Sequence, residues 1–388
     1  MPPILAVDHA NDPLVRKSQL TPAASAHLDF VRGLAAIAVL VSHWRNFFLL
    51  DWRSVPHHTP LLALLYFVTG FGHSAVIIFF VLSGYLIGGH VVQACRRNRW
   101  SWKRYALDRL TRLGIVLIPA LLFCLALDSA GIHLFHGDWL YSGSGHIAEM
   151  QVPVTDSPKV LLGNLLFLQT IRVPVFGSDF PLWSLANEFW YYVLFPLLAL
   201  PWFFKRGGLR TLCAALFLVI VVALPFAIAV SFLIWLLGTA VFLFPPARRL
   251  TGWQTAWAGG ISGLAMLAVL LGDRARHLSS AWSDNLLAVA FAALLYALVH
   301  GSLPASKLYS RVAKFISASS YTVYLAHFPF FACCLAAIGV RWLPDAWHLT
   351  LAAGLLIAGY GYAVGFAALF EAQTGRVKKW IGPRLGIG

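Results

Sequence analysis

The sequence predicts an all-α fold, a polytopic membrane helix bundle of about ten transmembrane helices with one short re-entrant or interfacial helix. Of its 388 residues, 59% are hydrophobic and 11% are charged, and the mean hydropathy is +0.74. Soluble domains carry about 25% charged residues, so a lipid environment is indicated. The sequence therefore predicts one membrane domain at 28–372, between an N-terminal tail at 1–27 and a basic C-terminal tail at 373–388.

The individual helices follow from the length of each apolar run, because a bilayer crossing needs about 20 apolar residues. The stretch 160–171 is too short to cross and is predicted to form the re-entrant or interfacial helix. The predicted spans are 29–50, 68–91, 108–130, 182–204, 210–227, 228–245, 253–272, 284–301, 315–339 and 349–371.

The basic residues predict the orientation of these helices. With the N-terminus inside, most of the 29 Lys and Arg residues fall in inner segments, as the positive-inside rule requires. We therefore expect both termini in the cytoplasm and a location in the cytoplasmic (inner) membrane of a bacterium. Basic cytoplasmic loops account for the net charge of +14 of the whole chain. Membrane lipids are therefore expected partners, and nucleic acid is not.

The first span carries ionisable residues at both ends, within the stretch LDFVRGLAAIAVLVSH. Arg32 and His43 are eleven residues apart, which returns to within about 20° of the same helix face over a rise of about 16 Å. One alternative is an arginine that snorkels beside Asp29, and another is a histidine that caps the helix end. The small residues between them favour a site around which other helices pack closely.

Two arginines lie at the inner start of the third span, in DRLTRLGIVLIP. Positive-inside anchoring explains the basic loop 96–104 that precedes them, but it explains Arg109 and Arg112 on the helix itself less well. Together with that loop, they could hold an anionic cytoplasmic ligand through bidentate phosphate contacts.

The fourth span contains PLWSLANEFWYY, with Ser184 and Glu188 at i, i+4 on one face. A carboxylate inside a membrane span is a functional candidate by default. The alternative is a structural partner for one of the arginines. Tyr192 and the neighbouring aromatic residues are typical of a membrane interface or a bundle core.

Two further segments carry histidines. The segment GHSAVIIFFVLSGYLIG (72–88) contains His73 and Ser83. No G-x-S-x-G elbow surrounds Ser83, so close helix packing at Ser83 and Gly84 is favoured over a role of Ser83 as a nucleophile. In SYTVYLAHFPF, His327 precedes Pro329, which can kink the helix and direct the ring inward. No metal-binding, P-loop or dinucleotide motif is present, so no metal is expected.

These segments together resemble the membrane-bound acyltransferase 3 family. The resemblance rests on five motifs in order, LDFVRGLAAIAVLVSH, FFVLSGYLIG, RLTRL, LWSLANEFWYY and SYTVYLAHFP, and it covers residues 27 to 371. One departure is GHSAVIIFF, where many members have an aspartate before the paired phenylalanines. The family's functional positions fall on Arg32, His43, Arg109, Arg112, Ser184, Glu188 and His327.

The resemblance implies an integral membrane O-acyltransferase that moves an acyl group, usually acetyl, from cytoplasmic acetyl-CoA. The implied acceptor is a carbohydrate-type hydroxyl on a surface polysaccharide, a lipid-linked precursor or a glycosylated small molecule. On this hypothesis His43 is the general base or a transient acyl carrier, Glu188 orients it or pairs with an arginine, and Arg32 lines the path of the pantetheine arm. The predicted substrate- and donor-binding residues are Arg109, Arg112, Asp29, Ser184, Tyr192, His327 and His73.

The alternative function is a secondary transporter or a flippase of a lipid-linked sugar, which also uses charges inside the membrane. Such proteins favour paired broken helices at matching positions of two halves. That pattern is not evident here, because the candidate residues concentrate in the first half of the chain.

Overall fold

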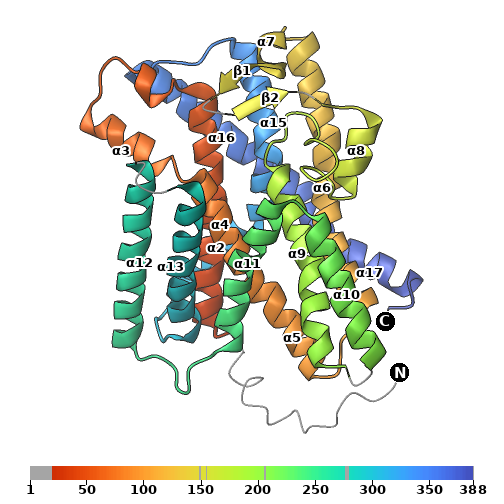
Figure 1. Cartoon of the computed structure of the whole chain (residues 1–388). Coiled ribbons are helices and arrows are strands. Elements are labelled where there is room, and N and C mark those ends of the chain that lie inside the picture. Colours follow the sequence, from red (N-terminus) through yellow and green to blue (C-terminus); the bar gives the residue numbers. More distant parts are fainter. Residues whose placement is uncertain (1–19, 148–149, 154, 205–206, 276–278, 388) are drawn as a thin grey trace. The chain divides into compact units, whose positions relative to one another are not determined.

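The computed structural model describes residues 20–147, 150–153, 155–204, 207–275 and 279–387, and these residues are mostly helical (Figure 1). Eight helices of this described part are long and apolar enough to cross a membrane. The polytopic helical bundle predicted from the sequence is thereby confirmed. The eight candidate spans are Pro22–Phe48, Pro60–Arg96, Trp102–His133, Phe226–Leu243, Gly252–Arg274, Trp282–His300, Ser320–Ile338 and Ala346–Arg384.

The two remaining predicted spans are helical but fall outside these eight. Span 182–204 corresponds to α9 (Leu182–Ala199), and span 210–227 corresponds to α10 (Gly207–Ala223). The 17 residues of α10 rise about 26 Å, which is less than the roughly 30 Å hydrocarbon core. Eight of the ten predicted spans therefore correspond to described helices that are long and apolar enough to cross a membrane.

Other boundaries also differ from the prediction. α2 (Pro22–Phe48) begins inside the predicted N-terminal tail, most of which lies outside the described residues. Within the predicted C-terminal tail, α17 (Thr374–Arg384) is helical. The short segment predicted at 160–171 forms only α8 (Pro158–Leu165), too short to cross.

The chain divides into two compact units, each built from three separate segments. α2, α4 (Gly72–Ser83) and α9 contribute residues to both units. Among the described residues, unit 1 comprises 20–32, Val76–Trp102 and Asn187–Ser317, and unit 2 comprises Gly33–Ala75, Lys103–Ala186 and 318–387.

Unit 1 is held together by close helix packing through glycines. A Cβ on Gly84 would lie 1.8 Å from the carbonyl oxygen of Trp235, and a Cβ on Gly238 would lie 1.8 Å from that of Val81. The predicted packing role of the Ser83–Gly84 segment is confirmed. Besides α9 and α10, the elements of unit 1 are a π-helical segment (Gly84–Gly88), α5 (Gly89–Arg96), α11 (Phe226–Leu243), α14 (Lys307–Ala318), and α12 (Gly252–Arg274) beside α13 (Ser280–His300) (Figure 1).

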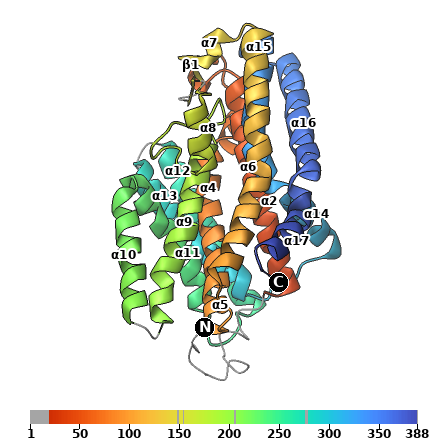
Figure 2. The same ribbon diagram turned by 90° about the vertical axis from the view of Figure 1, so that its right-hand side faces the viewer.

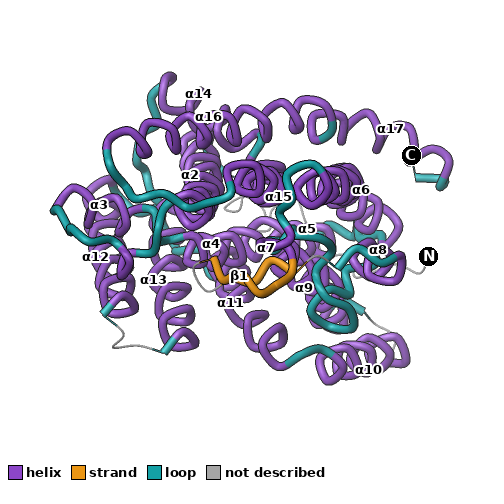
Figure 3. The backbone as a smooth tube through the Cα atoms, turned by 90° about the horizontal axis from the view of Figure 1, so that it is seen from above, coloured by secondary structure: helices purple, strands orange, loops and turns teal. Residues whose placement is uncertain are grey.

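Unit 2 is centred on α15 (Ser320–Ile338), which lies between α2 and α6 (Trp102–His133) when seen from above (Figure 3). The side view shows α16 (Ala346–Leu369) beside α15 (Figure 2). Phe47, Phe328 and Phe331 are fully buried in this unit. Its remaining elements are α3 (Pro60–Val68), α7 (Asp138–Tyr141), β1 (Ser142–Ile147), β2 (Met150–Pro153), α8 and α17.

The antiparallel pair β1–β2 is a departure from the predicted all-helical chain. It lies in the polar interval between α6 and α8, where a Gly- and Ser-rich segment carries no strand periodicity.

Capping residues mark the starts of two short helices in the sequence. Thr59 and Ser157 accept a hydrogen bond from the backbone at the third helical position of α3 and α8, and each is followed by proline, which is favoured there.

Candidate active site

The two histidines predicted as site residues meet inside unit 2. His43 of α2 and His327 of α15 lie 2.7 Å apart between Nδ1 and Nε2, and their rings stack with centroids 5.0 Å apart. His327 is fully buried, as predicted, whereas His43 is partly exposed. The pair therefore joins a fully buried histidine of α15 to a partly exposed residue of α2.

The hydrogen bonds assign the tautomers of this pair. His327 Nδ1 lies 2.6 Å from the carbonyl oxygen of Val323, and because a carbonyl only accepts, Nδ1 of His327 carries the proton. In the neutral ring, Nε2 of His327 is then an acceptor, and Nδ1 of His43 donates to it. The Nε2 atom of His43 is left unprotonated, which is the state that a general base needs.

Aromatic and hydroxyl groups hold the pair in position. The ring of Phe328 meets His43 edge-on at 5.1 Å and also contacts Phe180 at 6.0 Å. Tyr324 lies three residues before His327, and its hydroxyl is 2.5 Å from the hydroxyl of Ser184. Ser184 thus connects the start of α9 to α15, close in sequence to the imidazole that orients His43.

His73 lies at the start of α4, and its ring stacks on Trp183 at 6.2 Å. The neighbouring Gly72 packs against α2, where an added Cβ would come within 2.7 Å of the Ser42 hydroxyl. Since Ser42 precedes His43, the start of α4 lies beside the turn of α2 that carries this candidate residue. His73 itself is exposed.

A second polar cluster surrounds Arg112 on α6. One guanidinium nitrogen lies 2.7 Å from Oε1 of Glu371, a contact that is an ion pair rather than an aligned hydrogen bond. The other carboxylate oxygen accepts from the backbone N–H and the hydroxyl of Thr322, at 3.1 and 2.6 Å. The Tyr321 ring lies 5.3 Å from the same guanidinium. Arg112 is thus fixed to the first turn of α15, while Arg109 lies 6.0 Å from the Tyr105 ring.

Arg32 and Asp29 belong to a cluster within unit 1. The Arg32 guanidinium donates to Asp29 at 3.0 Å and to the hydroxyl of Ser317 at 3.2 Å, and Ser317 also donates to Asp29 at 3.0 Å. The local Asp29–Arg32 pair expected from the sequence is present, and it also ties α2 to α14.

Glu188 and Tyr192 lie in another hydrogen-bonded chain of unit 1. Tyr192 donates to Glu188 and accepts from Ser83 at 3.4 Å, and the Trp235 indole donates to Ser83 at 3.1 Å. Among the described residues Glu188 makes no ion pair with an arginine. Its predicted role beside the imidazole stays a prediction, since the residue that contacts His43 is His327.

Asp179 is a fully buried carboxylate just before α9. Neither of its carboxylate oxygens has a hydrogen-bond partner among the described residues. Burial, reinforced by the nearby Asp128, raises the pKa of Asp179 well above its usual value. Asp128 itself accepts hydrogen bonds from the backbone and the hydroxyl of Ser178, at 2.8 and 2.6 Å.

Several of these partners could not be found from the sequence. Glu371 closes an apolar run, where it is indistinguishable from an ordinary helix-end residue. Tyr324 and Thr322 carry no motif beyond their place near His327. In the part of the chain that the structure describes, no group of three or more His, Cys, Asp or Glu side chains is arranged to hold a metal ion.

A comparison with protein families gives the chemical context of this geometry. The family model described as an acyltransferase domain, acyltransferase 3, matches residues 25–371. No curated protein and no solved structure matches the chain.

Proposed function

Because the chain belongs to the acyltransferase 3 family, we propose that it is an O-acyltransferase that uses His43 as the general base. The observation that carries the proposal is the His43–His327 pair, which leaves Nε2 of the neutral His43 ring unprotonated. We propose acetyl-CoA as the acyl donor. The proposed acceptor is a hydroxyl of a surface polysaccharide, a lipid-linked precursor or a glycosylated small molecule.

In the proposed reaction, Nε2 of His43 takes the proton of the acceptor hydroxyl as its oxygen attacks the thioester carbonyl. The carbon–sulfur bond breaks, the acyl group stays on the acceptor oxygen, and the coenzyme A thiolate leaves and takes the proton from Nε2 of His43, which restores the neutral base. The imidazolium formed on His43 keeps its Nδ1 hydrogen bond to His327 throughout the step. His327 therefore supports both protonation states of the base without moving a proton itself.

The donor is proposed to bind with its phosphates at Arg109 and Arg112. This assignment is supported by α15, which contacts Arg112 through Tyr321 and contacts His43 through His327. Tyr321 and His327 are six residues apart, which corresponds to a rise of about 9 Å along the helix. A pantetheine arm is long enough to connect phosphates at the first position with a thioester at the second.

The test is acyl transfer in membranes that contain wild-type protein or a variant at matched abundance. Radiolabelled acetyl-CoA is supplied, and label is followed into the lipid and polysaccharide fractions. We expect His43→Ala to lower transfer by about 100-fold or more, since a positioned base contributes about 10²–10⁴. The matched control is His348→Ala, which removes a histidine paired with Asp345 at the start of α16.

Equal labelling by wild type and His43→Ala would remove His43 from the mechanism. Loss of label in His348→Ala as well would show that the assay reports protein integrity rather than chemistry. Label confined to one fraction identifies the class of acceptor.

A further inference from the structure

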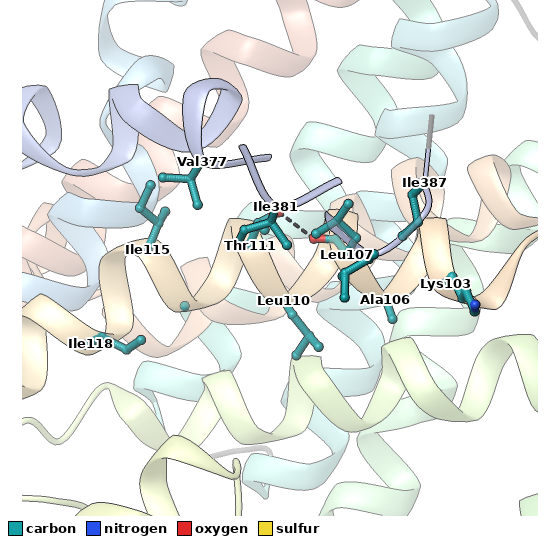
Figure 4. A pocket seen from close by; sticks show the side chains of 12 residues that line it. Lys103, Ala106, Leu107, Leu110, Thr111, Ile115, Ile118, Val377, Ile381 and Ile387 are labelled. Atoms are coloured by element: carbon teal, nitrogen blue, oxygen red, sulfur yellow. Dashed lines mark hydrogen bonds between the residues drawn. The ribbon is translucent and has the colours of Figure 1, made fainter. Parts of the chain in front are cut away.

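An apolar groove runs between α6 and α17 in unit 2 (Figure 4). Its volume is about 570 Å³, and its lining includes Leu110 and Ile118 of α6 and Val377 and Ile381 of α17. One lysine, Lys103, lies at the end of the groove where α6 begins. The groove thus combines a long apolar floor with one cationic end.

This groove is separate from the proposed donor site. At 100° per residue, the residues of α6 that line the groove occupy one face of the helix, and Arg109 and Arg112 point to the opposite face. Lys103 also lies on the groove face, so it faces away from the arginine pair. A ligand in the groove would therefore contact α6 without occupying the contacts of Arg112.

The dimensions of the groove match one leaflet of a bilayer. Lys103 is the second residue of a candidate membrane span, which places its ammonium near the level of the lipid headgroups. From Lys103 to Ile118, α6 rises about 22 Å. Half of a bilayer, including the headgroup region, is roughly 20–22 Å thick.

The charges around the headgroup end are positive. Lys103 is exposed and makes no ion pair with any residue that the structure describes. On α17, Arg384 is exposed, and its guanidinium lies 3.9 Å from the ring of the exposed Trp380. An amphipathic helix with basic residues and an exposed tryptophan is typical of a membrane interface that contains anionic lipids.

We propose that this groove binds one anionic glycerophospholipid, with an acyl chain along α6 and the phosphate at Lys103. The ligand would fill the space between α6 and α17, which are otherwise joined by the Lys378–Asp108 ion pair. Gly114 offers a direct way to block the site, because no atom lies within 4 Å of a Cβ built there. Because Gly114 lines the groove, a large side chain at this position starts from open space and occupies part of the groove.

The experiment uses the full-length protein in nanodiscs that contain phosphatidylglycerol or phosphatidylcholine with a photoreactive group on one acyl chain. After irradiation, labelled peptides are mapped by mass spectrometry. We expect phosphatidylglycerol to label 103–118 and 377–387 more strongly than phosphatidylcholine does. Gly114→Phe should lower this labelling about tenfold, whereas Gly361→Phe, at an equally open glycine on α16, should leave it unchanged.

The charge is tested with a matched pair of lysines. Lys103→Gln should lower the preference for phosphatidylglycerol about fivefold, as expected for one basic residue near an anionic headgroup. Lys379→Gln, an exposed lysine of α17 outside the groove lining, should leave the preference unchanged. Equal labelling by the two lipids would overturn the proposal, because the groove would then be an ordinary lipid-facing surface. Labelling that survives Gly114→Phe would overturn it as well.

Discussion

Replacing Glu371 is expected to weaken binding at the proposed donor site, because Glu371 holds Arg112 in place. Its side chain is 4% exposed and holds the Arg112 guanidinium through one oxygen and Thr322 through the other. In Glu371→Gln, the amide oxygen can still accept both bonds from Thr322. The ion pair to Arg112 is the interaction that is lost.

The magnitude follows from the burial of the two partners. Breaking a fully buried ion pair costs about 3–5 kcal/mol. The Arg112 side chain is 36% exposed and can be rehydrated, so the loss of unfolding free energy should be smaller, about 1–3 kcal/mol. Glu371→Ala also removes the acceptor of two Thr322 hydrogen bonds and should therefore lose more than Glu371→Gln.

Two measurements separate stability from function. Thermal unfolding in detergent should show a lower melting temperature for Glu371→Gln. The KM for the acyl donor should rise about tenfold with a smaller change in kcat, because Arg112 is no longer held at the first turn of α15. Thr322→Val, which removes only the hydroxyl, is the control and should shift stability with little effect on KM. A Glu371→Gln protein with a lower donor KM would refute the reasoning, because Glu371 would then compete with the phosphates instead of positioning Arg112.

Three other substitutions have defined outcomes. His327→Phe removes the acceptor of the His43 Nδ1 proton and should lower kcat at least tenfold with little change in the donor KM, measured in the same transfer assay. Because burial raises the pKa of Asp179, the folded protein binds a proton that the unfolded chain releases, and stability falls as pH rises above the unfolded pKa of about 3.9. Asp179→Asn should therefore raise the melting temperature at pH 7, with a gain that shrinks toward pH 4; an equal gain at both pH values would contradict this. Gly84→Ala places a Cβ 1.8 Å from a backbone oxygen of α11 and should destabilise unit 1 by about 1–3 kcal/mol in a thermal unfolding assay, whereas Gly263→Ala, at an open position, should not.

The fold was largely predictable because membrane helices have a strong one-dimensional signal. A run of about 20 apolar residues is visible without any tertiary information. Two predicted spans, α9 and α10, are helical but fall outside the eight candidate spans, because there the signal is short or less apolar. The short strands β1 and β2 were not predicted, because this polar segment gives no periodic pattern.

The sequence indicates the individual residues of the candidate site but not which of them contact one another. His43 and His327 each stand out as an ionisable residue within an apolar run, but their contact joins positions 284 residues apart and has no local signature. The ion pair between Arg112 and Glu371 has no local signature either. Only Arg112 was predicted from the sequence as a site residue. Glu188 attracted attention as a carboxylate within a predicted span, yet its hydrogen-bond partner is Tyr192, one helical turn away. Residue type and spacing indicate which side chains are unusual, whereas tertiary contacts decide which of them act together.

The contacts of α15 suggest why the two clusters of unit 2 lie on one helix. Its first turn anchors Glu371 and Arg112 through Thr322 and Tyr321, and its next turns anchor His43 through His327. A helix changes length little under load, because each residue adds a fixed rise of about 1.5 Å. The separation between the proposed phosphate site and the proposed base is therefore set by the number of residues between two contacts on one rigid element. An acyl donor of fixed arm length requires such a fixed separation, since a reacting atom displaced by about 1 Å can lose about 100-fold in rate.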